Sequence, residues 1–142
     1  MPRILGVDYG SRRIGLALSD PTATIAQPLP TLTRRAGKRP PVQALVDLVH
    51  AQEVAEIVIG LPLALSGEET DWTAEVRDFG AKLAQRSGVS VSFLDERMTS
   101  VQAEKTVRSL GLKRSEREQK TRVDAAAALL ILQAYLDRRP RA

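Results

Sequence analysis

The first part of the chain shows short apolar runs separated by turn residues. Residues 4–7 and 14–18 are two such runs, and the turn around Gly10 between them predicts a hairpin of two strands. Residues 25–32 predict a third strand. Because proline cannot donate a hydrogen bond to a neighbouring strand, the two prolines in this third run confine it to an edge of the sheet or to an irregular stretch.

Further along, the apolar positions recur with the spacing of one helix face. The first set with this spacing is Val42, Leu45, Val46 and Val49. A capping box formed by Ser66 and Glu69 predicts the start of a second helix, which ends at Gly88. Trp72 falls on the apolar face of this helix, so we expect it in the core.

The remaining pattern alternates strands with helices. Residues 57–59 and 89–94 predict strands, residues 99–111 a helix that opens on a capping box, and residues 121–139 a last helix. The resulting order, β-β-β-α-β-α-β-α-α, is typical of an α/β domain. We therefore expect one domain over 1–142, with a mixed central sheet of three leading antiparallel strands, then parallel strands, and helices on both faces.

Composition excludes several kinds of chemistry. The 142 residues include no cysteine and a single histidine, so there is no disulfide framework, thiol nucleophile or cysteine zinc site. We expect the histidine, His50, to be a plain surface residue. Any catalytic metal must then be held by carboxylates, which favour hard ions such as Mg²⁺ or Mn²⁺.

Neither a signal peptide nor a membrane span is indicated. The longest wholly apolar run, Ala125–Leu132, has eight residues, far fewer than the roughly 18 that a bilayer span needs. Arg3 and Asp8 interrupt the apolar N-terminal segment. The sequence therefore predicts a cytoplasmic protein with no membrane partner.

Charge is distributed unevenly along the chain. Residues 1–39 carry seven basic and two acidic side chains, residues 40–96 carry three and ten, and residues 97–142 carry eleven and five. Two basic ends therefore enclose an acidic middle. This distribution suits a nucleic-acid partner better than the modest net charge of +4 alone suggests.

Three acidic loci stand apart from the acids on predicted helix faces: Asp8, the pair Asp95-Glu96, and Asp124. The first interrupts an apolar strand, the pair directly follows a strand, and the last precedes eight apolar residues in a helix. Acids so close to a core are costly unless they are paired, hydrogen-bonded or metal-bound. Each alone could be an ion pair or a helix cap. Together, at the ends of central elements, they indicate two-metal phosphodiester cleavage.

One ambiguity concerns the pair Asp95-Glu96. Successive side chains of an extended strand point to opposite faces, so we expect at most one of them in the site. Glu96 is favoured for its longer reach. The other acid would then contact Arg97 or cap the helix that follows.

Four motifs carry a family resemblance: residues 6–20 (GVDYGSRRIGLALSD), 57–62 (IVIGLP) with Ser66-Gly67, 95–100 (DERMTS) and 120–133 (KTRVDAAAALLILQ). In this order they resemble the motifs of the YqgF/RuvX family. The resemblance implies an RNase H-like fold related to the Holliday-junction resolvase RuvC. It implies a hydrolase that cleaves phosphodiester bonds, either maturing the 5′ end of pre-16S ribosomal RNA or resolving four-way DNA junctions.

The same resemblance implies site residues and cofactors. Asp8, Asp95, Glu96 and Asp124 would be the catalytic acids, with two Mg²⁺ or Mn²⁺ ions held by Asp8, Glu96 (or Asp95) and Asp124. One departure from the broader RNase H pattern is that the strand ending at Gly60 carries no acid. The third ligand would therefore come from the next strand.

Basic residues near these motifs predict the nucleic-acid contacts. Arg13 and Arg97 adjoin the acids and would bind phosphates, or form ion pairs with the acids. The stretch 108–122 has six basic and two acidic residues, so it predicts either a backbone-binding surface or a solvated loop. Within this stretch, the residues that we expect to contact nucleic acid are Lys113, Arg114, Lys120 and Arg122.

Two other functions remain open. A hairpin with Asp8-x-Gly10 also resembles the phosphate-binding opening of actin-like ATPases and sugar kinases, but those proteins need two such domains. A non-catalytic nucleic-acid-binding factor for ribosome assembly could keep the fold. Symmetric cleavage of a four-way DNA junction needs two active sites and would predict a homodimer, whereas processing a ribosomal RNA precursor would not.

Overall fold

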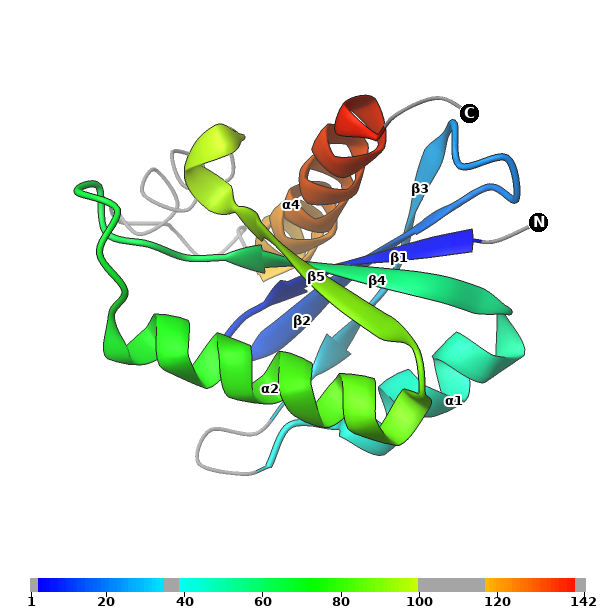
Figure 1. Cartoon of the computed structure of the whole chain (residues 1–142), viewed down its shortest axis with the longest axis horizontal. Coiled ribbons are helices and arrows are strands. Elements are labelled where there is room, and N and C mark those ends of the chain that lie inside the picture. The colour runs from blue at the N-terminus through cyan, green and yellow to red at the C-terminus, as the bar shows by residue number, and fades with distance from the viewer. Residues whose placement is uncertain (1–2, 35–38, 100–116, 140–142) are drawn as a thin grey trace.

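A five-stranded mixed sheet forms the centre of the molecule (Figure 1). The computed structural model describes residues 3–34, 39–99 and 117–139, with the backbone alone for residues 117–125. The strands are β1 (Arg3–Tyr9), β2 (Arg13–Ser19), β3 (Ala26–Thr33), β4 (Val54–Leu61) and β5 (Ser90–Asp95). Their spatial order is β3-β2-β1-β4-β5.

Strand directions agree with the prediction from sequence. β1 pairs antiparallel with β2, and β2 pairs antiparallel with β3. β4 runs parallel to β1, and β5 runs parallel to β4. The hairpin closes through a hydrogen bond from the Gly10 amide to the Arg13 carbonyl at 2.9 Å. The proline-containing strand β3 lies at one edge, as its composition predicted.

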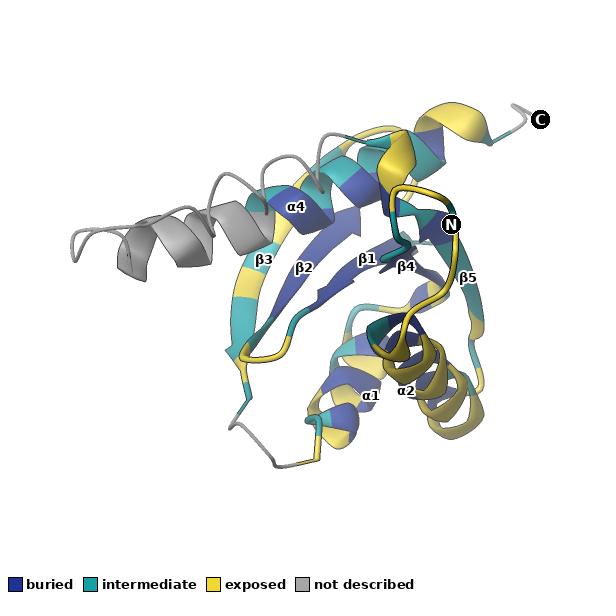
Figure 2. Ribbon diagram, turned by 90° about the vertical axis from the view of Figure 1, so that its left-hand side faces the viewer, coloured by how far each residue is buried: buried dark blue, intermediate teal, exposed yellow. Residues whose placement is uncertain are grey.

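Helices cover both faces of the sheet (Figure 2). α1 (Val42–Ala51) and α2 (Asp71–Ser87) lie on one face, and α4 (Arg117–Arg138) crosses the other. The predicted helix at 99–111 lies outside the described residues. Within the described part of the chain, no helix combines the length and apolar character needed to cross a membrane.

Alternation along β1 divides the core into two layers. Leu5, Val7 and Tyr9 belong to the cluster shared with α1 and α2. Ile4 belongs to the cluster shared with α4. Gly6 faces α4 as well, because a Cβ at this position would lie 2.7 Å from the Leu132 Cβ. The even-numbered positions of β1 therefore point towards α4.

Two predictions about α2 were wrong. The helix starts after Thr70 instead of Ser66, because the side chains and amides of Thr70 and Thr73 form the capping box. The Thr73 hydroxyl also donates to the Pro62 carbonyl, which ties the helix start to the end of β4. Trp72 is only half-buried, since it lies in the first turn at the rim of the core. The predicted end at Gly88 is confirmed by its left-handed backbone, with φ of 72°.

Candidate active site at the ends of β1 and β5

Asp8 is a buried acid on the α4 face of the sheet. Its exposed fraction is 2%, and it follows Ile4 and Gly6 on the same face of β1. Across the hairpin its strand partner is Gly15. Gly15 is itself buried, so this part of the hairpin is covered and not open to solvent.

Glu96 is the second buried acid, also with an exposed fraction of 2%. It is the first residue of the short 3₁₀ helix η1 (Glu96–Met98), which begins directly after β5. This change of backbone direction frees Glu96 from the alternation of the strand. Its side chain lies over Gly60 at the end of β4, where an added Cβ would be 2.9 Å from Glu96 Oε1.

Strand register places the two acids side by side. Val7 pairs with Ile59 on the adjacent strand, so Asp8 is level with Gly60, the next residue of β4. Neighbouring strands are about 4.8 Å apart. The carboxylate of Glu96 above Gly60 is therefore about one strand spacing from the position of Asp8. No acid stands at the end of β4, where Gly60 leaves the space in which the Glu96 side chain lies.

Asp95 faces away from this pair and binds Arg97. Its carboxylate accepts from Arg97 Nη2 at 2.7 Å and from Arg97 Nε at 3.0 Å. It also accepts from the Arg97 amide at 2.9 Å, so it caps η1. The hydrogen bonds from Arg97 lower the pKa of Asp95 below its ordinary value. The predicted contact with Arg97 is present, whereas the cap is on η1 and not on the predicted helix at 99–111, which lies outside the described residues.

Arg97 is therefore one half of an ion pair in this structure. Its guanidinium also donates to the Leu65 carbonyl at 3.3 Å and lies over Gly67, whose φ is 91°. These contacts join η1 to the loop that follows β4. Arg13 lies at the start of β2, two positions before Gly15, and so shares the face on which Asp8 lies.

Asp124 belongs to α4, but its side chain is outside the described part of the structure. The helix places position 124 one turn before Ala128, whose carbonyl would be 3.1 Å from a Cβ on Gly6. Lys120 and Arg122 precede it in the same helix, with side chains that are likewise not described. Lys113 and Arg114 lie outside the described residues altogether.

Two of the candidate acids present the type of ligand that a hard divalent cation binds. Asp8 and Glu96 offer carboxylate oxygens, the ligands preferred by Mg²⁺ and Mn²⁺, and no side chain on Gly60 intervenes. Across the described ranges, no group of three potential metal ligands comes together. A complete carboxylate site would need a further ligand, and Asp124 is the one that the sequence offers.

Sequence reasoning missed the role of Gly60. The available signal was a glycine at the end of an otherwise β-branched strand, a position where glycine often marks close approach. In the structure the approaching groups are the Glu96 carboxylate and the Ile131 side chain, whose Cδ1 would be 2.5 Å from an added Cβ.

Comparison of sequences identifies close relatives along nearly the whole chain. A protein of Koribacter versatilis named "Putative pre-16S rRNA nuclease" is 44% identical over 137 residues, which cover 96% of this chain and 88% of that relative. A protein of the same name from Maridesulfovibrio salexigens is 37% identical over 136 residues, which cover 96% of this chain and 98% of the relative.

Solved structures share the fold at low sequence identity. RuvC of T. thermophilus, solved in complex with a Holliday junction substrate, has a TM-score of 0.58 at 16% identity and covers 96% of this chain and 94% of its own. The fowlpox virus Holliday junction resolvase has a TM-score of 0.53 at 9% identity and covers 95% of this chain and 97% of its own. These likenesses confirm the RNase H-like fold.

The match extends beyond the fold to the family itself. The model of the RuvX family, described as Holliday junction resolvase, matches residues 2–138, a range that includes Asp8, Gly60, Glu96 and Asp124. With the two relatives above 35% identity, this match shows that the chain belongs to the RuvX family.

Proposed function

We propose that this chain is a metal-dependent nuclease that hydrolyses phosphodiester bonds in structured nucleic acid. The observation that carries the proposal is the pair of buried carboxylates, Asp8 and Glu96, on either side of Gly60. Two acids held this close under a helix repel each other unless positive charge is nearby. In a nuclease family, that arrangement is best explained as a site for divalent cations.

In this proposal Asp8, Glu96 and Asp124 hold two Mg²⁺ or Mn²⁺ ions. When bound, such ions activate the attacking water and stabilise the leaving oxygen, so that hydrolysis leaves a 5′-phosphate. The chain's own contribution is geometry: β1 and η1 fix two carboxylates against a rigid sheet. Asp95 does not bind the ions and instead positions Arg97, whose Nη1 would exchange its long 3.3 Å contact with the Leu65 carbonyl for a phosphate of the substrate.

The names of the relatives favour ribosomal RNA precursor as the substrate. Both relatives described above are named for pre-16S rRNA, and we carry that substrate over as part of the proposal. A four-way DNA junction is the second candidate, favoured by the description of the family. Symmetric junction cleavage would require a homodimer, and either activity would act in the cytoplasm.

The test uses purified full-length protein with two substrates, a pre-16S rRNA leader fragment and a four-way DNA junction. Cleavage is measured with Mg²⁺, with Mn²⁺ and with EDTA. We expect metal-dependent cleavage that is lost in Asp8→Asn, Glu96→Gln and Asp124→Asn, with unfolding temperatures close to that of the native protein. Asp95→Asn is the matched comparison at an adjacent carboxylate outside the pair: it should keep metal-dependent cleavage at saturating substrate, with weaker substrate binding because it loosens Arg97.

The outcomes separate the candidate functions. If both substrates bind and neither is cleaved with any metal, the protein is a non-catalytic binding factor and the proposal fails. If Glu96→Gln cleaves normally and Asp95→Asn does not, the assignment of the two acids is reversed. A junction cut with paired symmetric incisions by a dimer would identify DNA as the substrate.

A further inference from the structure

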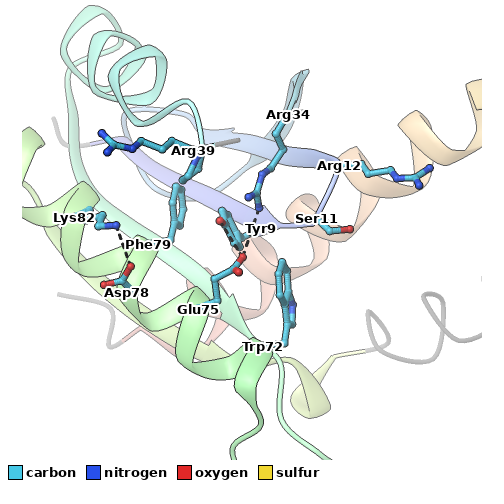
Figure 3. Close-up of a pocket in the computed structure, with 11 residues that line it drawn as sticks. Tyr9, Ser11, Arg12, Arg34, Arg39, Trp72, Glu75, Asp78, Phe79 and Lys82 are labelled. Carbon is cyan, nitrogen blue, oxygen red and sulfur yellow. Dashed lines mark hydrogen bonds and ion pairs between the residues drawn. The ribbon is translucent and has the colours of Figure 1, made fainter. Parts of the chain in front are cut away.

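A cavity lies on the opposite face of the sheet from the buried acids. The end of β1, the β1–β2 turn, the segment after β3 and α2 line this open cavity, which has a volume of about 510 Å³ (Figure 3). Tyr9 forms its floor, and because Tyr9 directly follows Asp8, the two sites share adjacent residues of one strand. Of the proposed metal-binding acids whose side chains are described, neither Asp8 nor Glu96 lines the cavity.

One wall of the cavity is aromatic. The ring of Tyr9 stacks on Phe79, with centroids 4.2 Å apart, and on Trp72, with centroids 5.4 Å apart. Tyr9 and Phe79 are buried, whereas Trp72 is half-buried and lines the opening. A half-buried indole that continues a stack of two buried rings is an aromatic surface against which a planar ligand can pack.

Arg34 supplies a buried positive charge beside these rings. Its side chain is only 9% exposed, and its guanidinium lies 4.7 Å from the centre of the Tyr9 ring. Nη1 donates to the Gly10 carbonyl at 3.0 Å and lies 3.7 Å from Glu75 Oε2. Nε has no acceptor among the described residues, and it belongs to the guanidinium edge that pairs with phosphates and carboxylates.

The other charges of the lining leave a positive excess. Of the two acids, Asp78 pairs with Lys82 at 3.1 Å, and Glu75 accepts from the Tyr9 hydroxyl at 3.3 Å as well as lying close to Arg34. Arg12 and Arg39 also border the cavity without an ion pair among the described residues, although their guanidinium groups extend away from the Tyr9 ring (Figure 3). The cavity therefore offers aromatic stacking together with cationic groups.

We propose that this cavity binds a single unpaired nucleotide, with the base against Trp72 and the phosphate towards Arg34, at the rim that Arg12 borders. Stacking of a base on an aromatic side chain tolerates any sequence, and an arginine fork matches a phosphate. The same chemistry is presented by a free nucleotide and by an unpaired nucleotide within a strand. The site lies outside the acid pair and does not depend on the proposed cleavage.

Trp72 provides the assay, because it is the only tryptophan of the chain. Its fluorescence, excited at the red edge of indole absorption, is titrated in EDTA with adenosine monophosphate, a single-stranded hexaribonucleotide and inorganic phosphate. We expect a saturable change with one or both of the first two ligands. Arg12→Glu, a substitution at an exposed position, and Arg34→Gln should each weaken binding about tenfold. Arg86→Glu, an exposed change on α2 outside the cavity, should not.

Several results would overturn the site. These are the absence of any fluorescence change, equal binding by all variants, and phosphate binding as tightly as the nucleotide, which would mark an anion site with no role for the base. Binding of the monophosphate identifies a free nucleotide as a sufficient ligand, whereas binding of the oligonucleotide alone identifies the strand. Asp8→Asn should keep this binding, so failure here is distinct from failure of the nuclease proposal.

Discussion

Gly60→Ala tests the arrangement of the two acids with the smallest available change. The substitution adds one methyl group at the end of β4. That methyl would lie 2.5 Å from Ile131 Cδ1, 2.9 Å from Glu96 Oε1 and 3.1 Å from Glu96 Cγ. Carbon atoms pack favourably at about 3.5–4.0 Å, so the Ile131 methyl must move by about 1–1.5 Å and the Glu96 side chain by about 0.5–1 Å.

The two displacements have different costs. Inserting a methyl into a packed interior costs typically 1–3 kcal/mol, and for a protein of this size each kcal/mol lowers the unfolding temperature by about 3–4 °C. We therefore expect a decrease of about 3–12 °C. Displacement of the Glu96 carboxylate by up to about 1 Å should lower the cleavage rate about 100-fold, which is far more than the loss of folded protein would cause.

The assay compares rate and stability in the same preparations. Cleavage of the preferred substrate is measured at least 15 °C below the unfolding temperature of each variant. Gly88→Ala is the control: its φ of 72° makes alanine strained, but an added Cβ meets nothing within 4 Å, so stability falls by about 1 kcal/mol and the rate stays unchanged. Normal cleavage by Gly60→Ala would refute the placement of Glu96 in the active site.

Three further predictions follow from the described contacts. Arg97→Ala should weaken substrate binding, and unchanged affinity would contradict that role. Because Arg97 lowers the pKa of Asp95, the variant should also lose less stability as the pH falls through that depressed pKa; an unchanged decrease in stability at acidic pH would contradict the ion pair. Burial raises the pKa values of Tyr9 and Tyr135, so their contribution to stability is complete below about pH 10 and is lost as the pH rises through the raised values. In a pH titration, tyrosinate absorbance should therefore appear at higher pH in the folded protein than in the unfolded chain. Thr70→Ala removes the N-cap of α2 and should cost about 1 kcal/mol, measured by urea unfolding; no change would place the helix start elsewhere.

The periodicity of the apolar residues was sufficient to predict the sheet and the described helices on its two faces. The alternation of β1 and the helical spacing of α1 both follow from which side chains must be buried. The second acid of the site could not be settled in the same way. A strand that simply continued would have oriented Asp95 and Glu96 oppositely, whereas the turn into η1 re-aims Glu96 over Gly60.

The start of α2 and the position of Trp72 also could not be predicted from the local sequence. Ser66 and Glu69 have the spacing of a capping box, but so do Thr70 and Thr73, and only the latter pair is reached by the Pro62 carbonyl. The choice between two local signals was therefore made by a contact eleven residues away in sequence. Trp72, the second residue of the helix, then lies at the rim of the core and not inside it.

The prolines of β3 also restrict how copies of this protein can associate. Pro28 and Pro30 are both exposed and lie on the outermost strand of the sheet. Neither can donate a hydrogen bond, so this rim is a poor template for an incoming strand. A dimer that joined two sheets edge to edge through β3 is disfavoured, and the same feature protects newly made chains from aggregating through their sheet edges.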